Sequence, residues 1–131
     1  MAEISITAPI APGELIDKIT ILEIKSERMT DAAKLRNVRI ELDTLAATRD
    51  GHIEPSDEMA RLTAELKSIN EELWVIEDDI RDCERNGDFG PEFIRLARAV
   101  YVTNDRRADV KKKINLLLGS TIVEEKSYAA Y

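Results

Sequence analysis

The side chains best suited to chemistry lie in one stretch near the C-terminal end, residues 101–113. Arginine recognises phosphate or carboxylate through its planar fork of donors, and Asn104 and Lys111 fall on the apolar stripe expected for this helix. A polar residue on such a stripe costs stability and usually fixes a register or a site. The stretch therefore indicates either a solvated basic face or a site for an anionic small molecule such as a sugar phosphate or nucleotide. The candidate ligand-binding residues are Tyr101, Asn104, Arg106, Arg107 and Lys111.

The partner of Lys111 decides between two functions. An unpaired ammonium group is costly to bury, and the candidate acids are Glu65, Glu124 and Glu125. If an acid pairs with Lys111, the tail is a structural clasp and the chain is a non-catalytic interaction module with a protein partner. If none does, an anion-binding protein or enzyme is favoured. The candidate tail contacts are Glu124, Glu125, Lys126 and Tyr128.

Catalytic motifs are incomplete in this sequence. An acidic group on the helix 57–86 resembles the carboxylate clusters of all-helical nucleotide pyrophosphatases, but Val75 stands where their third glutamate belongs. The segment around Ile16 and Asp17 resembles the first helix of all-helical chorismate mutases, but Gly13 replaces their arginine. One histidine and one cysteine cannot build an ordinary zinc site. We therefore expect no cofactor and no metal, leave catalytic residues unassigned, and favour a non-enzymatic role.

The elements that must position these residues are helices. Only five glycines and four prolines occur in 131 residues, too few for many strands and tight turns. We predict a single all-α domain over residues 1–131, a helical bundle with a long antiparallel coiled-coil hairpin. Its parts are a short extended N-terminal arm (1–12), a helical segment (13–49), the hairpin (57–118) and a tail (119–131).

The hairpin is predicted from an apolar seam and from charge. The seam runs from Met59 to Cys83 with alternating steps of three and four residues, the spacing of a coiled coil. Residues 57–86 carry a net charge of −6 and residues 91–118 a net charge of +4. Antiparallel pairing then places Arg106 near Glu72 and Arg107 near Glu71. Arg95 and Arg98 are expected near Asp78, Asp79 and Asp82.

The first helix, from about residue 13 to 28, is apolar on more than one side. A helix that is apolar nearly all round is buried, and a small chain has little material to cover it. We therefore predict a homodimer with this helix near the interface. Trp74 lies just off the seam and is expected to pack against a neighbouring helix, and Asn70 is placed to meet Asn104 across the hairpin.

Partners and location are predicted from charge and from cysteine usage. A net charge of −7 lacks the basic footprint of a nucleic-acid-binding protein, and no run approaches the ~20 apolar residues that span a membrane. The N-terminus shows no signal peptide, and the single cysteine, Cys83, suits a reducing compartment. We expect a cytoplasmic protein that binds neither nucleic acid nor membrane.

Three segments together resemble a bacterial family of small proteins known as a domain of unknown function. They are residues 12–25, residues 96–108 (with Leu96-Ala97-Arg98 and Asn104-Asp105-Arg106-Arg107-Ala108), and Glu124-Glu125-Lys126-Ser127-Tyr128. The resemblance covers nearly the whole chain. It implies no chemistry, but members found near or fused to glycosyltransferases imply a link to bacterial surface glycan synthesis.

Overall fold

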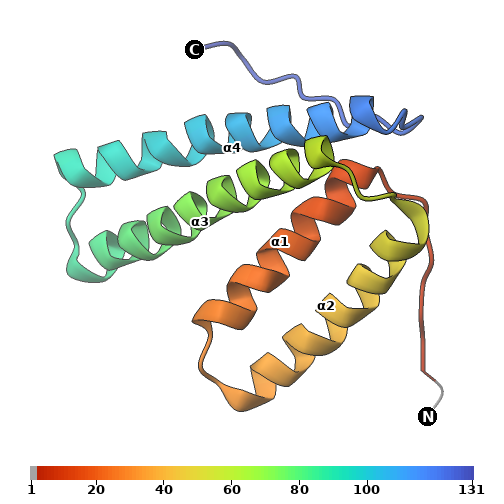
Figure 1. Ribbon diagram of the computed structural model, residues 1–131. Helices are drawn as coiled ribbons and strands as arrows, with labels where there is room; N and C mark the ends of the chain where they lie inside the picture. Colours follow the sequence, from red (N-terminus) through yellow and green to blue (C-terminus); the bar gives the residue numbers. More distant parts are fainter. Residues whose placement is uncertain (1–2) are drawn as a thin grey trace.

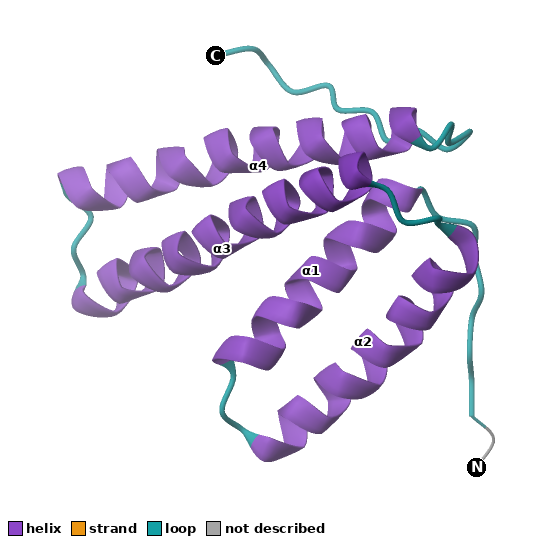
Figure 2. Ribbon diagram, viewed as in Figure 1, coloured by secondary structure: helices purple, strands orange, loops and turns teal. Residues whose placement is uncertain are grey.

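Four helices make up the fold, as the sequence predicts. The computed structural model describes residues 3–131, and 73% of the chain is helical, with no strand among the described residues (Figure 2). Residues 3–10 form an extended arm, and residues 1–2 of the predicted arm lie outside the described residues. The helices are α1 (Pro12–Arg28), α2 (Ala32–His52), α3 (Asp57–Asn86) and α4 (Pro91–Leu117).

Local sequence signals set the helix ends. The Asp31 carboxylate accepts a hydrogen bond from the Lys34 backbone N–H at 2.9 Å and caps α2. The Ser56 hydroxyl caps α3 in the same way through the Met59 N–H at 3.1 Å. Gly87 ends α3 in the left-handed conformation, with φ of 64°, which glycine adopts without the steric cost of a side chain.

The helices form two hairpins that share α1 as their central element (Figure 1). α3 and α4 run antiparallel and make the longer hairpin, and α1 and α2 make the shorter one. α1 contacts α2, α3 and α4, whereas α2 contacts no helix but α1 among the described residues. The distal half of the long hairpin extends beyond the shorter one.

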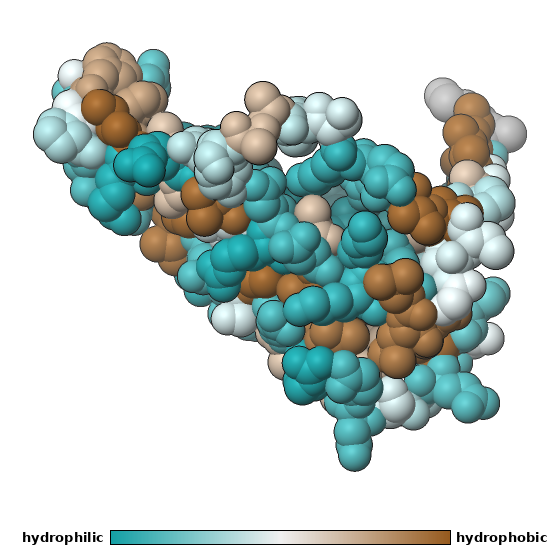
Figure 3. All heavy atoms as spheres, turned by 90° about the horizontal axis from the view of Figure 1, so that it is seen from above, coloured by the Kyte–Doolittle hydropathy of each residue, from teal (hydrophilic) through white to brown (hydrophobic). Residues whose placement is uncertain are grey.

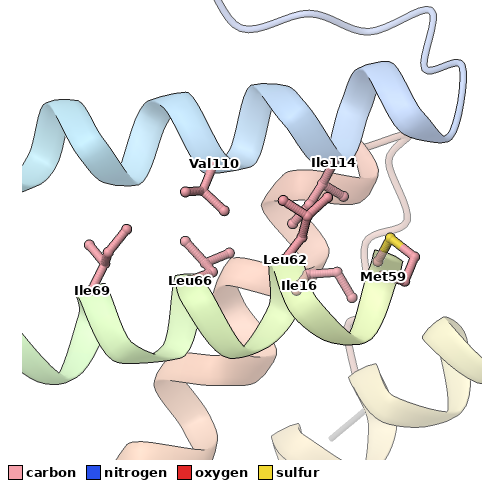
Figure 4. Packing of buried hydrophobic residues seen from close by; sticks show 7 residues of the cluster. All are labelled: Ile16, Met59, Leu62, Leu66, Ile69, Val110 and Ile114. Atoms are coloured by element: carbon pink, nitrogen blue, oxygen red, sulfur yellow. The ribbon is translucent and has the colours of Figure 1, made fainter. Parts of the chain in front are cut away.

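The core lies where α1 crosses the long hairpin (Figure 4). Towards the hairpin tip, where α1 has diverged, Leu73, Ile76 and Ile80 of the predicted seam are only half-buried. The seam is thus covered without a break only where a third helix joins the pair, and Cys83 at the hairpin tip is buried again. The cluster contains Ile16 of α1, Met59, Leu62, Leu66 and Ile69 of α3, and Val110 and Ile114 of α4.

The apolar faces of α1 are covered within one chain. Ile16, Ile19 and Ile24 are each 1% exposed, and Leu15 and Leu22 are also buried. α2 covers one side of α1, and α3 and α4 cover the other. The argument that α1 needs a second subunit to cover it is therefore wrong, because three neighbouring helices already do so.

The predicted stripe on α4 is rotated from the one that is buried. The fully buried apolar residues of α4 are Leu96, Val110 and Ile114, so Asn104 and Lys111 do not occupy seam positions as predicted. Both are half-buried beside the seam. α4 carries so many polar residues that two of its faces are similarly apolar. The contacts with α1 determine which of these two faces is buried.

The hairpin charges follow the predicted register in part. Arg106 lies 3.0 Å from the Glu72 carboxylate, as predicted. Arg107 binds Asp17 of α1 instead of Glu71, and Glu71 lies 3.8 Å from Arg28. Arg95 binds Glu92 one turn earlier in its own helix and also lies near Asp79 of α3, as predicted, without forming an ion pair with it.

The Arg106–Glu72 pair should select register more than it stabilises. Reversing either charge, by Arg106→Glu or Glu72→Lys, should lower the unfolding free energy, and combining the two should restore most of the loss. We expect a coupling of about 0.5–1 kcal/mol in a double-mutant cycle measured by urea unfolding. Arg49→Glu with Glu72→Lys is the additive control, and a coupling near zero for the first pair would reject its role.

Candidate functional site

A buried polar network joins α1, α3 and α4 beside the core. The Asp17 carboxylate accepts hydrogen bonds from the Arg107 Nε at 2.8 Å and from the Asn70 amide at 3.0 Å. A second bond from the Arg107 guanidinium makes the pair bidentate. The same Asn70 amide donates to the Thr20 hydroxyl at 3.0 Å. Asp17 is 1% exposed and Thr20 is fully buried, so the network holds three helices in one arrangement.

The environment keeps both members of the ion pair charged. Burial raises the pKa of Asp17, but the hydrogen bonds from Arg107 and Asn70 and the nearby charges outweigh it and hold that pKa below its ordinary value. The hydrogen bond to Asp17 raises the pKa of Arg107. A bidentate arginine–carboxylate pair of this kind is the strongest geometry available to such groups.

Lys111 is held by two acids from different parts of the chain. Its Nζ lies 2.7 Å from the Glu14 carboxylate of α1 and 3.2 Å from Glu124 of the tail. Burial lowers the pKa of Lys111, but these hydrogen bonds raise it more. Of the three candidate acids, Glu124 is the one that contacts Lys111, whereas Glu65 lies 3.9 Å from Arg61.

α1 and α4 approach most closely at Gly13. Its backbone N–H donates to the Asn115 side-chain oxygen at 2.7 Å. A Cβ atom at this position would lie 2.8 Å from that oxygen and would collide with the Lys111 backbone carbonyl. The absence of a side chain at Gly13 therefore allows the N-terminus of α1 to dock on α4.

Two cavities open beside the polar network. The larger has a volume of about 460 Å³, and we call it the Trp74 cleft. The smaller, of about 80 Å³, shares Asn104 and Arg107 with it and also touches Lys111, Glu124 and Lys126. Asn104 and Arg107 therefore lie on both cavities. The Trp74 cleft is lined by Ile21, Ile24, Asn70, Leu73, Trp74, Glu77, Asp78, Arg81, Asn104 and Arg107.

The tail turns back along α4, as Figure 1 shows, and brings Tyr101 to a different place from the other candidates. The Tyr101 ring packs edge-on against Tyr131, with centroids 5.1 Å apart, and the Tyr131 hydroxyl donates to Asp105 at 2.6 Å. Lys126 lies 5.9 Å from the Tyr128 ring centroid. The Tyr128 side chain is largely exposed. Tyr101 therefore lines a cavity with the tail and does not close a pocket around Asn104.

The five candidates thus divide into three groups. Arg106 faces Glu72 on the outside of the hairpin. Arg107 and Lys111 bind acids of α1, and Asn104, about one turn before Arg107 on α4, lines the two cavities. Glu125 is exposed, and no ion pair joins it to another described residue.

Sequence reasoning missed Asp17 and Glu14 as partners of the basic residues. One signal was available for Asp17, because an acid between Ile16 and Ile19 on a helix that is apolar nearly all round must be buried and paired. No comparable signal pointed to Glu14, whose contact with Lys111 depends on the docking of α1 on α4.

Within residues 3–131, no group of three or more histidine, cysteine or acidic side chains is arranged to hold a metal ion. None of the helices in that range combines the length and apolarity needed to cross a membrane.

Comparison with known proteins gives one match. Residues 6–131 match the model of a family described as "Family of unknown function (DUF6165)". No curated protein and no solved structure matches the chain. The predicted resemblance to a domain of unknown function is therefore confirmed over almost the full length.

Proposed function

The chain belongs to DUF6165, a family of unknown function, and from this premise we propose that it is a non-catalytic interaction module that associates with a second copy of itself. The observation that carries the proposal is the pairing of Lys111 with Glu14 and Glu124. A lysine satisfied by two acids of its own chain has no need of a bound anion, and the tail that supplies Glu124 acts as a structural clasp.

Two further cations of the basic stretch are paired in the same way, whereas Lys112 and Lys113 are exposed and form no ion pair with another described residue. Arg107 is occupied by Asp17 and Arg106 by Glu72. An anionic ligand would have to displace a carboxylate from each of them. The alternative function, binding of a sugar phosphate or nucleotide by this stretch, is therefore less well supported than the interaction module.

The surface best suited to a partner lies at the end of the bundle opposite the hairpin tip. An apolar groove of about 780 Å³ lies there between the arm, the end of α2 and the end of α4. Hydrophobic side chains gather over this end of the molecule in Figure 3. Large contiguous apolar patches are uncommon on the surface of monomeric soluble proteins, and those that occur often mark interaction sites. The apolar side chains exposed at this end of the molecule include Ile10, Leu116, Leu117, Leu118, Ile122 and Val123.

The chain itself carries a segment that suits this groove. Ile4 and Ile6 of the arm are 88% and 87% exposed, so no residue between 3 and 131 covers them. They alternate with polar residues in an extended segment, and the groove is lined by the following arm residues, Thr7 to Ile10. Exchange of arms between two copies would bury both isoleucines in a symmetric pair, the commonest form of homo-oligomer.

Substitutions in the arm test the proposed dimer. Burying an isoleucine is worth about 1.5–3 kcal/mol, so Ile4→Asp combined with Ile6→Asp should weaken self-association at least about tenfold. Sedimentation velocity over a range of protein concentrations measures this directly. We expect the wild type to be dimeric at micromolar concentration and the arm variant to be monomeric.

Ile40→Asp is the matched control, because Ile40 is 67% exposed on α2 and does not line the groove. It should leave the dimer intact. A wild-type chain that is monomeric at hundreds of micromolar, or an equal loss from Ile40→Asp, would contradict the proposal. A separate protein partner and a role in surface glycan synthesis stay predictions from the sequence.

A further inference from the structure

A buried hydrogen-bond acceptor faces the Trp74 cleft without a partner. Asn70 is 5% exposed, and its amide nitrogen donates to Asp17 and Thr20. The amide orientation is fixed, because an ionised carboxylate can only accept. The Asn70 carbonyl oxygen makes no hydrogen bond with any residue of the range 3–131, and no sealed side-chain atom in that range lacks a partner. This oxygen is therefore open to the cleft, where water or an N–H or O–H group of a bound molecule can donate to it.

Two other polar groups of the cleft can also accept hydrogen bonds from a ligand. Asp78 forms no ion pair with another residue of the described chain, and its carboxylate can only accept. Asn104 lines the cleft, and its amide makes no hydrogen bond within residues 3–131. Its carbonyl oxygen can serve as a third acceptor, and its NH2 group stays a donor. A ligand that bonds the three acceptors must carry several N–H or O–H donors.

The remaining walls indicate a cation with an apolar body. Glu77 neutralises Arg81, and Asp17 neutralises Arg107, so the unpaired charge at the cleft is that of Asp78. The face of a tryptophan attracts ammonium and guanidinium groups, and Trp74 lines the same cleft. Ile21, Ile24 and Leu73 supply apolar surface for a stem. About 460 Å³ is room enough for a small organic ligand.

We propose that the Trp74 cleft binds an ammonium or guanidinium group carried on a short apolar stem. Its N–H groups donate to Asn70 and Asn104 and its charge lies against Trp74, while Asp78, two helical turns from Asn70 on α3, attracts it across the cleft. This site is separate from the interaction surface proposed above, because the arm groove and the Trp74 cleft share no lining residue.

Calorimetric titration with four probes of similar size tests the class of ligand. n-Pentylammonium and n-butylguanidinium should bind, whereas 1-pentanol and pentanoate, which match the stem without the positive charge, should bind at least about tenfold more weakly. Nα-Acetyl-lysine methylamide presents the same ammonium from a peptide backbone. Tighter binding of this probe than of n-pentylammonium assigns the site to a partner's lysine, and the reverse order assigns it to a free amine.

Matched variants locate the site. Asp78→Asn should weaken n-pentylammonium binding about tenfold, because the Asp78 carboxylate is the unpaired negative charge that attracts the ammonium across the cleft, and Trp74→Leu should weaken it also. Asp79→Asn makes the same change one residue along, outside the cleft, and should leave affinity within twofold. Circular dichroism melting checks that each variant folds. Equal binding of 1-pentanol, equal losses from the two aspartate variants, or no saturable binding of any amine at tens of millimolar would overturn the proposal.

Discussion

Asp17→Asn is expected to lower the unfolding free energy by about 3 kcal/mol, because removing one partner of a buried ion pair leaves the other charge uncompensated. Arg107 would keep its charge, since its side chain is 29% exposed and an arginine does not lose its proton. The loss corresponds to a fall of roughly 10 °C in Tm for a chain of this size. Thermal and urea unfolding followed by circular dichroism measure both.

The same residue predicts how stability depends on pH. The pKa of Asp17 is lowered in the folded state, so the pair stabilises fully above the ordinary pKa of an aspartate, about 3.9. Below that value the unfolded chain takes up the proton first, and the contribution is lost as pH falls towards the folded pKa. The stability difference between wild type and Asp17→Asn should therefore be constant near neutral pH and shrink below about pH 4.

The control is Glu58→Gln, which breaks the ion pair of Glu58 with Arg61 on the surface of α3. Both side chains are largely exposed, so this change should cost far less than Asp17→Asn. If Asp17→Asn cost no more than Glu58→Gln, the network would not be what joins the three helices.

Gly13→Ala is expected to destabilise the protein by about 3 kcal/mol. The added Cβ would collide with the backbone carbonyl of Lys111, and a carbonyl within a helix cannot turn aside as a long side chain can. α1 would have to move away from α4, which would strain the hydrogen bond from Gly13 to Asn115 and the contact of Glu14 with Lys111. Overpacking in a close contact costs about 1–3 kcal/mol before such losses.

Gly51→Ala makes the same change in an open place. No atom lies within 4 Å of a Cβ built at Gly51, which is in α2. Alanine favours a helix over glycine by about 0.5–1 kcal/mol, so this variant should be as stable as the wild type or slightly more stable. Equal effects of the two substitutions in urea unfolding would show that the approach of α1 to α4 is not tight.

The helices could be predicted because their signals are local. Capping residues such as Asp31 and Ser56, prolines at the first helical positions, and the glycine at 87 act within a few residues of the chain. The apolar seam of α3 could be predicted as well, because its alternating steps of three and four residues persist from Met59 to Cys83. These features depend on the backbone and on one helix at a time.

The site could be predicted only in part because its contacts are distant in sequence. Arg107 and Asp17 are 90 residues apart, and Lys111 and Glu14 are 97 apart. Within α4, nothing marks Asn104 as facing a cleft until the position of α1 is known. The cost of an unpaired charge predicts that Lys111 has an acid or a bound anion beside it, or reaches solvent, and Glu124 is among the acids that the sequence offers. Which other acids lie near depends on how the helices cross.

The position of α2 divides the molecule into a cooperative unit and an appendage. α2 contacts no described helix except α1, and Val38 is its one fully buried residue. None of the hydrogen bonds that join α1, α3 and α4 passes through it. Elements with few buried contacts are the ones that open locally in a folded protein. We therefore expect α2 to move away from α1 about the segment 29–31 while the other three helices stay packed. Such an opening would uncover the α2-facing side of α1, which is apolar, and change the accessible surface of the protein without unfolding it.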